Sequence, residues 1–221
     1  MWGRMNKPAD HWDQLHEHPR FRPAYPNDHV VRFLVSSRVL LAKSPRPRLL
    51  DIGTGSGRHL RLAADLDFEP FGMDISSVGL QHVRRDFPGF PLARASMLRL
   101  PFAGGSFDIA LSFGVFCYGT GAETRQAIAE AHRVLAIEGR LFAVLRTTQD
   151  YRFGRGESLG DNSFRLTIAD TNEFDTVQHF LTEEQVQPYF RDFSSVSYEK
   201  TETTFAHRTR LDSDWLVTAT R

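Results

Sequence analysis

Apolar and polar positions along the chain follow two periods in turn, one typical of helices and one typical of buried strands. Between residues 26 and 43, apolar side chains recur at helical spacing after Asn27 or Asp28 as the capping residue, so we expect a helix there. Buried strands are predicted by five short apolar runs, at residues 48–52, 70–75, 91–96, 107–113 and 140–146. Further helices are predicted between these runs, at residues 58–65, 76–86 and 122–137.

Helices that alternate with strands on this scale predict an α/β fold with a parallel, doubly wound sheet. Gly139 follows the predicted helix that ends at Ile137, and we interpret this glycine as its C-terminal cap. In such a sheet, ligands bind in a crevice at the carboxyl ends of the strands. The functional residues are therefore expected just after each strand.

The regular alternation stops after the fifth predicted strand. Residues 147–178 show no sustained period, and we interpret them as an irregular insert on the substrate side. Thr182 starts a capping box that predicts a short helix to about Phe190. Strands at 196–204 and 215–220, joined by a polar stretch, predict a closing antiparallel hairpin. This organisation suggests an N-terminal arm over residues 1–25 and a single domain over residues 26–221.

Composition places the chain among ordinary globular proteins. Its 221 residues include 27 Lys and Arg against 27 Asp and Glu, so the formal net charge is zero and nucleic acid is not an expected partner. No apolar stretch has the length of a signal peptide or a membrane span, and we expect a soluble, cytoplasmic protein without a membrane partner. The single thiol, Cys117, excludes an internal disulfide.

A glycine-rich turn carries the main chemical signal. Asp51 ends the first predicted strand and is followed by the run Gly53-Thr54-Gly55-Ser56-Gly57, where glycine lets the backbone turn sharply and approach a ligand. Arg58 stands where a dinucleotide fingerprint requires its third glycine, which argues against a nicotinamide cofactor. Asp74 ends the next strand, where an acid can accept hydrogen bonds from both hydroxyls of a ribose. Together these residues indicate an adenosine-type ligand.

The order of motifs also resembles a known family. The relevant segments are Leu50-Asp51-Ile52-Gly53-Thr54-Gly55-Ser56-Gly57, residues 98–102, residues 105–108, residues 133–141 and residues 215–217. In this order and spacing the chain resembles the class I S-adenosylmethionine-dependent methyltransferases, of the bacterial small-molecule type similar to methyltransferase domain 11. The resemblance implies a Rossmann-like, mostly parallel seven-stranded sheet with helices on both faces and an antiparallel C-terminal hairpin. It also implies methyl transfer to a small-molecule acceptor, with release of S-adenosylhomocysteine.

The resemblance implies a cofactor site made of Asp51, Gly53, Thr54, Gly55, Gly57, Asp74, Ile75, Ser96, Met97 and Phe113, with Tyr25 as part of a lid. In that site the glycine turn and Asp51 hold the methionine part of the cofactor, and Asp74 holds the ribose. Ile75, Ser96 and Met97 face the adenine, and the carbonyl of Phe113 accepts from the cofactor ammonium. Many relatives carry an acid where this chain has Ser96, so adenine recognition is expected to depend more on the Met97 backbone.

Methyl transfer depends mainly on alignment and on exclusion of water, so a strong general base is optional. Tyr118, His179 and Arg146 are the candidate catalytic residues, and Cys117, Asp150 and His82 are further candidates for proton transfer. Each candidate also has a plain structural interpretation, because Tyr118 and Cys117 can pack in the core and His179 can belong to a hydrophobic staple. Arg146 suits either a substrate carboxylate or phosphate, or an ion pair with an acid.

Several alternatives stay open on the sequence alone. A module that binds S-adenosylmethionine without catalysis, a nicotinamide-dependent oxidoreductase, and a methyltransferase acting on protein or nucleic acid are the competing functions. The N-terminal histidines His11, His16 and His18 do not have the spacing of a structural zinc site, so we expect no metal and a solvated arm. The expected assembly is a monomer or a homodimer.

Overall fold

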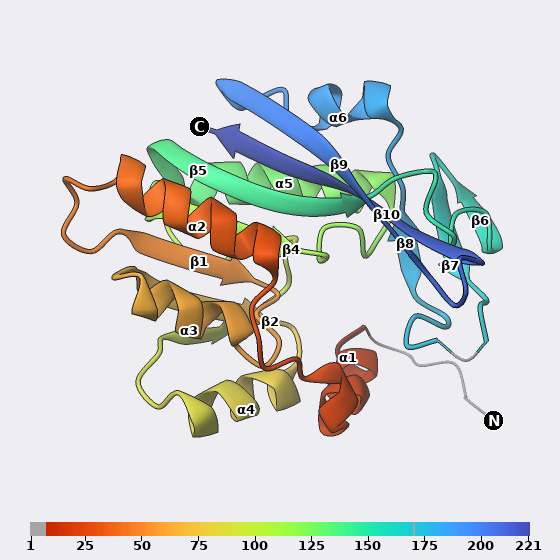
Figure 1. Ribbon diagram of the computed structural model, residues 1–221, viewed down its shortest axis with the longest axis horizontal. Helices are drawn as coiled ribbons and strands as arrows, with labels where there is room; N and C mark the ends of the chain where they lie inside the picture. The colour runs from red at the N-terminus through yellow and green to blue at the C-terminus, as the bar shows by residue number, and fades with distance from the viewer. Residues whose placement is uncertain (1–7, 170) are drawn as a thin grey trace.

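The computed structural model describes residues 8–169 and 171–221, and a seven-stranded sheet forms its centre (Figure 1). The strands of this sheet are β1 (Arg48–Ile52), β2 (Glu69–Asp74), β3 (Leu92–Arg94), β4 (Phe107–Phe113), β5 (Leu135–Arg146), β9 (Ser195–Phe205) and β10 (Arg210–Thr220). They lie in the order β3-β2-β1-β4-β5-β10-β9, and β1 to β5 are parallel to one another. Strand β10 runs antiparallel to both β5 and β9, so the predicted fold class is confirmed.

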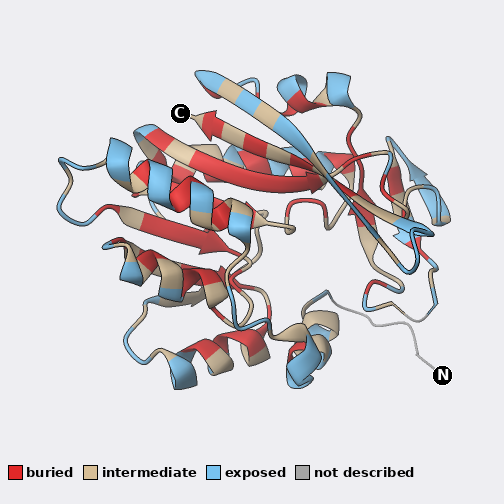
Figure 2. Cartoon of the chain, viewed as in Figure 1, coloured by how far each residue is buried: buried red, intermediate tan, exposed pale blue. Residues whose placement is uncertain are grey.

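Helices cover both faces of the sheet. They are α1 (Pro8–Glu17), α2 (Asp28–Leu40), α3 (Arg58–Asp65), α4 (Ser77–Asp86), α5 (Gly121–Val134) and α6 (Glu183–Tyr189). Successive strand residues point to opposite faces, so β1 buries Leu49 in a core with α2 and α3 and buries Leu50 in a core with α5 and α6. Figure 2 shows the resulting buried central strands and the more exposed edge strand β9. Among the described residues, none of the helices has the length and apolar composition needed to cross a bilayer.

Local capping chemistry explains where the predicted helices begin. The side chain of Asn27 accepts a hydrogen bond from the N–H of His29 at the start of α2, and that of Ser76 accepts from Gly79 at the start of α4. The side chain of Gln185 accepts from the N–H of Thr182, completing the predicted capping box of α6. These starts were expected from residues within one turn of each helix.

The end of α5 differs from its prediction. The helix stops at Val134 rather than Ile137, and Leu135 already pairs with Phe107 of β4. Gly139 therefore lies inside β5 and does not cap the helix. The pairing of β4 with β5 is irregular before Ile109 meets Arg140, which accommodates the extra residues of β5. A buried leucine at position 135 fits the end of a helix and the start of a strand equally well. The spacing of apolar residues therefore could not predict where α5 ends and β5 begins.

The insert at 147–178 is more regular than expected. It contains β6 (Gly156–Gly160) and β7 (Ser163–Leu166), and with β8 (Val177–His179) these form a small antiparallel sheet in the order β6-β7-β8. The strands have only three to five residues, too few to show a period in the sequence. Hydrogen bonds from Gly119 N to Val177 O and from His179 N to Cys117 O join this small sheet to the loop after β4.

The closing hairpin also begins earlier than predicted. Strand β10 starts at Arg210, so only Ala206–Thr209 form the connection. Ala206, His207 and Arg208 all have positive φ values, which fold the chain back tightly. Residues 210–214 were expected in a loop, but they pair with β9, and the side chains of Asp212 and Asp214 find partners in Arg152 and Arg146.

The N-terminal arm is a docked helix, which corrects the expectation of a solvated arm. Residues 1–7 lie outside the described part of the chain, and α1 follows them beside α4 (Figure 1). The carboxylate of Asp13 accepts from the hydroxyls of Ser76 and Ser77 at 2.7 and 3.1 Å and from the N–H of Val78 at 3.1 Å. An acid at the positive end of α4 is electrostatically favourable as well.

These contacts predict that Asp13→Ala releases α1 from α4. Hydrogen exchange of residues 8–17, followed by mass spectrometry, should become faster by about tenfold or more, because three hydrogen bonds to α4 are lost. The exposed Gln14→Ala on the same helix is the matched control and should leave the exchange unchanged. Equal exchange in both variants would show that Asp13 does not hold the helix.

Candidate functional site

A cavity of about 640 Å³ opens at the carboxyl ends of β1, β2, β3 and β4, where the fold class predicts a ligand site. Its volume is within the usual range for small-molecule sites. One wall comes from the glycine turn and the ends of β2 and β3, and includes Gly53, Thr54, Gly55, Asp74, Ile75, Ser96 and Met97. The other walls come from α1, from the loop after β4 and from the insert, and include Trp12, His16, Phe113, Tyr118, Thr176 and Val177.

The glycine turn is shaped so that only glycine fits at its first position. Gly53 has a φ of 75°, and a Cβ there would lie 2.3 Å from a methyl carbon of Val115. Gly57 also has a positive φ and precedes α3, where a Cβ would meet Val83 of α4 at 3.0 Å. Gly57 is absent from the cavity lining, so its place in the site is to turn the chain rather than to contact a ligand.

Asp74 organises the floor of the cavity. Its two carboxylate oxygens accept hydrogen bonds from the N–H groups of Gly55 and Ser76, each at 2.8 Å. Burial raises the pKa of Asp74, while these two backbone donors favour its ionised form. The carboxylate thus lies in the cavity wall and also fixes the two chain turns beside it.

Asp51 is buried directly beneath the glycine turn. Its Oδ2 atom has no hydrogen-bond partner among the described residues, and neither has the hydroxyl of Thr54. Burial raises the pKa of Asp51 to about 7. The ring of His59 lies 4.0 Å away, but burial lowers the pKa of His59 to about 3, so it brings no positive charge at neutral pH. The glycine turn therefore has oxygen atoms without hydrogen-bond partners among the described residues, and these can accept hydrogen bonds from a ligand.

Helix α1 contributes Pro8, His11, Trp12 and His16 to the cavity lining, and none of them was predicted as a site residue. The ring of Trp12 meets that of Tyr118 edge to face, with centroids 4.7 Å apart. The Nδ1 atom of His16 lies 3.0 Å from the Ser76 hydroxyl, and burial lowers its pKa. No local pattern in the sequence predicts that α1 lies beside the cavity, so its residues were expected on a solvated arm. Within residues 8–169 and 171–221, no three His, Cys, Asp or Glu side chains are grouped as metal ligands.

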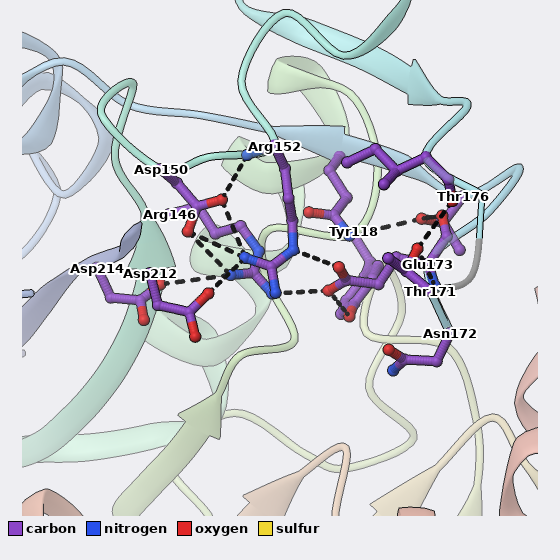
Figure 3. Close-up of polar contacts among 12 residues, drawn as sticks. Tyr118, Arg146, Asp150, Arg152, Thr171, Asn172, Glu173, Thr176, Asp212 and Asp214 are labelled. Atoms are coloured by element: carbon purple, nitrogen blue, oxygen red, sulfur yellow. Dashed lines mark hydrogen bonds and ion pairs between the residues drawn. The ribbon is translucent and has the colours of Figure 1, made fainter. Parts of the chain in front are cut away.

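A buried ion cluster lies behind Tyr118 (Figure 3). It consists of Arg146, Asp150, Arg152, Glu173, Asp212 and Asp214, and joins the ends of β5 and β10 to the insert. Arg146 donates to Glu173 at 2.7 Å, and Arg152 donates to the other oxygen of Glu173 and to Asp150. Burial opposes ionisation of Glu173, but the two arginines together lower its pKa. Arg146 therefore pairs with acids, which was one of its two predicted roles.

Comparison with known proteins shows which proteins this chain is similar to. The model of the methyltransferase domain family matches residues 50–143, from the glycine turn to the middle of β5. A SAM-dependent methyltransferase of Methanosarcina mazei superposes with a TM-score of 0.64 at 22% identity, covering 80% of this chain and 93% of that one. Residues 50–143 thus match a methyltransferase domain, and the chain shares the fold of S-adenosylmethionine-dependent methyltransferases.

Two further similarities concern substrates of other proteins. The 1,6-didemethyltoxoflavin-N1-methyltransferase of Burkholderia thailandensis, solved with its substrate and S-adenosylhomocysteine, has a TM-score of 0.62 at 15% identity, with 100% of this chain and 93% of that chain covered. A Bacillus subtilis (strain 168) protein named "Putative 23S rRNA (guanine-N(1)-)-methyltransferase" is 30% identical over 128 residues. That match covers 56% of this chain and only 42% of the relative.

The methyltransferase cavity contains most of the predicted cofactor residues, but not all of them. Asp51 and Gly57 lie just behind the lining, whereas Tyr25 is 84% exposed and lies outside the cavity. The predicted lid position of Tyr25 is therefore taken by α1, whose Trp12 and His16 reach the cavity. Ser96 does line the cavity, with its hydroxyl accepting a hydrogen bond from the N–H of Leu98 at 3.2 Å.

Of the candidate catalytic residues, only Tyr118 reaches the cavity. His179 is buried elsewhere, with Nδ1 3.0 Å from the Ser163 hydroxyl and Nε2 2.7 Å from the Tyr189 hydroxyl. Arg146 is likewise absent from the lining and belongs to the ion cluster. The structure thus places neither His179 nor Arg146 in the cavity lining. The interpretation of His179 as a packed residue fits instead.

The further proton-transfer candidates also lie outside the cavity. Cys117 is buried, and burial raises its pKa to about 12, so its thiol stays protonated at neutral pH. Asp150 pairs with Arg152 in the ion cluster. His82 contacts the guanidinium of Arg22 at 3.1 Å and lines a separate small hollow.

The raised pKa of Asp51 has a consequence for stability. An acid with a pKa of 3.8 in the unfolded chain and about 7 in the folded chain favours folding only while it is protonated. The unfolding free energy should therefore fall as pH rises from about 4 to 7, by an amount on the order of 4 kcal/mol at most. Asp51→Asn should remove this fall and be more stable than the wild type at pH 8 in urea unfolding. The same pH slope in both proteins would contradict burial of an ionisable Asp51.

The position of His179 generates a second expectation. His179→Ala removes two buried hydrogen bonds and leaves a void, so the unfolding free energy should drop by about 2–4 kcal/mol. Binding of S-adenosylhomocysteine, measured by calorimetry below the unfolding transition, should stay the same because the ring is outside the cavity. If His179→Ala bound S-adenosylhomocysteine more weakly and kept the wild-type free energy of unfolding, His179 would have a role in the binding site.

Proposed function

We propose that the protein transfers a methyl group from S-adenosylmethionine to a small-molecule acceptor and releases S-adenosylhomocysteine. The observation that carries this proposal is the single cavity that joins the glycine turn and Asp74 to Tyr118 and the insert. A cofactor seated on the glycine side would face an acceptor seated on the Tyr118 side. Methyl transfer needs this alignment and little else.

The residues on the glycine side fit the cofactor chemically. Thr54 lines the cavity, and its hydroxyl, which has no partner among the described residues, suits the carboxylate of an amino acid. Asp74 can accept from ribose hydroxyls, and Ile75 and Met97 offer apolar contacts for adenine. Bound S-adenosylmethionine supplies a methyl group activated by a sulfonium. The chain's own part is to orient both molecules and to keep water out, with α1 and the insert as the covering elements.

A second candidate substrate is ribosomal RNA, favoured by the printed name of the Bacillus subtilis relative. Most of that relative's length lies outside the match, so its substrate is a weak guide. The zero net charge of this chain also provides no general attraction for a polyanion. A small acceptor agrees better with the volume of the cavity.

Cofactor binding is tested first. We expect S-adenosylhomocysteine, but not NADH, to raise the thermal unfolding midpoint. Asp74→Asn should weaken S-adenosylhomocysteine by about 10- to 100-fold in calorimetry, because a charged hydrogen-bond acceptor is lost. The exposed Asp86→Asn is the matched control. Wild-type affinity in Asp74→Asn would remove Asp74 from the cofactor site.

The acceptor class is tested with the labelled methyl group. Tritium from S-adenosyl-L-[methyl-³H]methionine should appear in small molecules of a cell extract and not in 23S rRNA added to the same reaction. Transfer to rRNA alone would replace the proposed acceptor. Tight cofactor binding without transfer to either would favour a module that only binds the cofactor.

A further inference from the structure

Tyr118 lines the cavity, and its single hydroxyl proton is donated to an acceptor outside the cavity lining. The hydroxyl donates to Oε1 of Glu173 at 3.2 Å, in the ion cluster behind the wall (Figure 3). A phenol has one proton to donate and two lone pairs that accept. A ligand atom that reaches the Tyr118 oxygen therefore meets lone pairs only.

The direction of this hydrogen bond is set by Glu173. Both of its oxygens accept from guanidinium groups, Oε1 from Arg146 and Oε2 from Arg152. These two cations keep the buried carboxylate ionised, and an ionised carboxylate has no proton to return. Burial and the charge of Glu173 also raise the pKa of Tyr118 well above its usual value, so the phenol keeps its proton.

The surroundings of Tyr118 restrict the shape of a partner as well. The ring of Trp12 stands nearly perpendicular to the Tyr118 ring, at 84°, and gives the cavity an aromatic corner. His11 of α1 is held to the carbonyl of Asn172 at 2.9 Å, next to Glu173 in the chain. The corner is thus made by α1 and by the loop after β4, and both are tied to the segment that carries Glu173.

We propose that Glu173 is a positioning residue that makes Tyr118 a hydrogen-bond acceptor toward the cavity, and that the methyl acceptor is a small aromatic compound with a ring N–H or O–H nucleophile. This rests on the proposed function of the same site.

In the proposed reaction, the nucleophile's lone pair forms the new bond to the methyl carbon. The carbon–sulfur bond breaks with its electron pair kept by sulfur, and the nucleophile's proton passes to water. The methylated product has lost the donor that Tyr118 recognises, so it binds less tightly than the acceptor.

The test uses the full chain saturated with S-adenosylhomocysteine and pairs of probes that differ by one methyl group. The pairs are indole and 1-methylindole, benzimidazole and 1-methylbenzimidazole, and 4-methylphenol and 4-methylanisole, with binding followed by ligand-observed NMR. In the wild type, the unmethylated member of at least one pair should bind about fivefold more tightly or better. Tyr118→Phe should reduce this preference to about one, while Tyr151→Phe, whose ring packs on Phe205, should retain it.

Glu173→Gln tests the positioning role. The amide presents an N–H group to one of the two arginines, so the cluster should rearrange and the preference for unmethylated probes should fall with it. The exposed Glu202→Gln is the control. If Glu173→Gln does not fold, the probe preference of Tyr118→Phe is sufficient to test the proposal. The proposal is wrong if the wild type prefers no unmethylated probe or if Tyr118→Phe keeps the preference. Failure of S-adenosylhomocysteine to bind the wild type would instead overturn the proposed function.

Discussion

The carboxylate of Asp74 is the contact on which the cavity depends. It accepts the N–H of Gly55 in the glycine turn and the N–H of Ser76 before α4, so one side chain holds two turns that belong to different βα units. Ser76 in turn donates to Asp13 of α1. Burying a charge is costly unless donors surround it, and here backbone amides provide them. The floor of the cavity and its N-terminal cover therefore share one hydrogen-bonded chain.

The two halves of the cavity have different physical origins. Parallel pairing of β1 with β2 and β4 brings their carboxyl ends to one edge, so the side of the cavity with the glycine turn follows from the sheet itself. The side of the cavity with Tyr118 comes partly from segments outside the alternation, namely α1 and the small sheet β6-β7-β8. Loops and inserts of this kind vary among proteins that share a fold, and they determine function.

The ion cluster connects these additions to the main sheet at an electrostatic cost. Two arginines face four acids in a largely buried volume, and burial raises the pKa of Asp214 to about 6. Such clusters seldom add much stability beyond what well-packed apolar side chains would provide. What they do provide is a defined geometry, because each guanidinium fits only one arrangement of carboxylates. Here that geometry holds the insert against Tyr118.

The sequence by itself determined the features that depend on neighbours within a few residues. The strand and helix order, the helix starts at Asn27 and Ser76, the glycine turn and the acid at Asp74 were all readable from periodicity and turn chemistry. These features were enough to predict the fold and the glycine turn that forms one wall of the cavity.

Only the tertiary structure decided which distant residues meet. Docking of α1 on α4 placed His16, which was expected on a solvated arm, in the cavity wall, and pairing with Phe107 made Leu135 a strand residue. Glu173 meets Arg146 and Tyr118 across the insert, and nothing local marks such a partnership. Burial and ion pairing act through space, between side chains whose separation along the chain is arbitrary, so a pattern in the sequence does not reveal them.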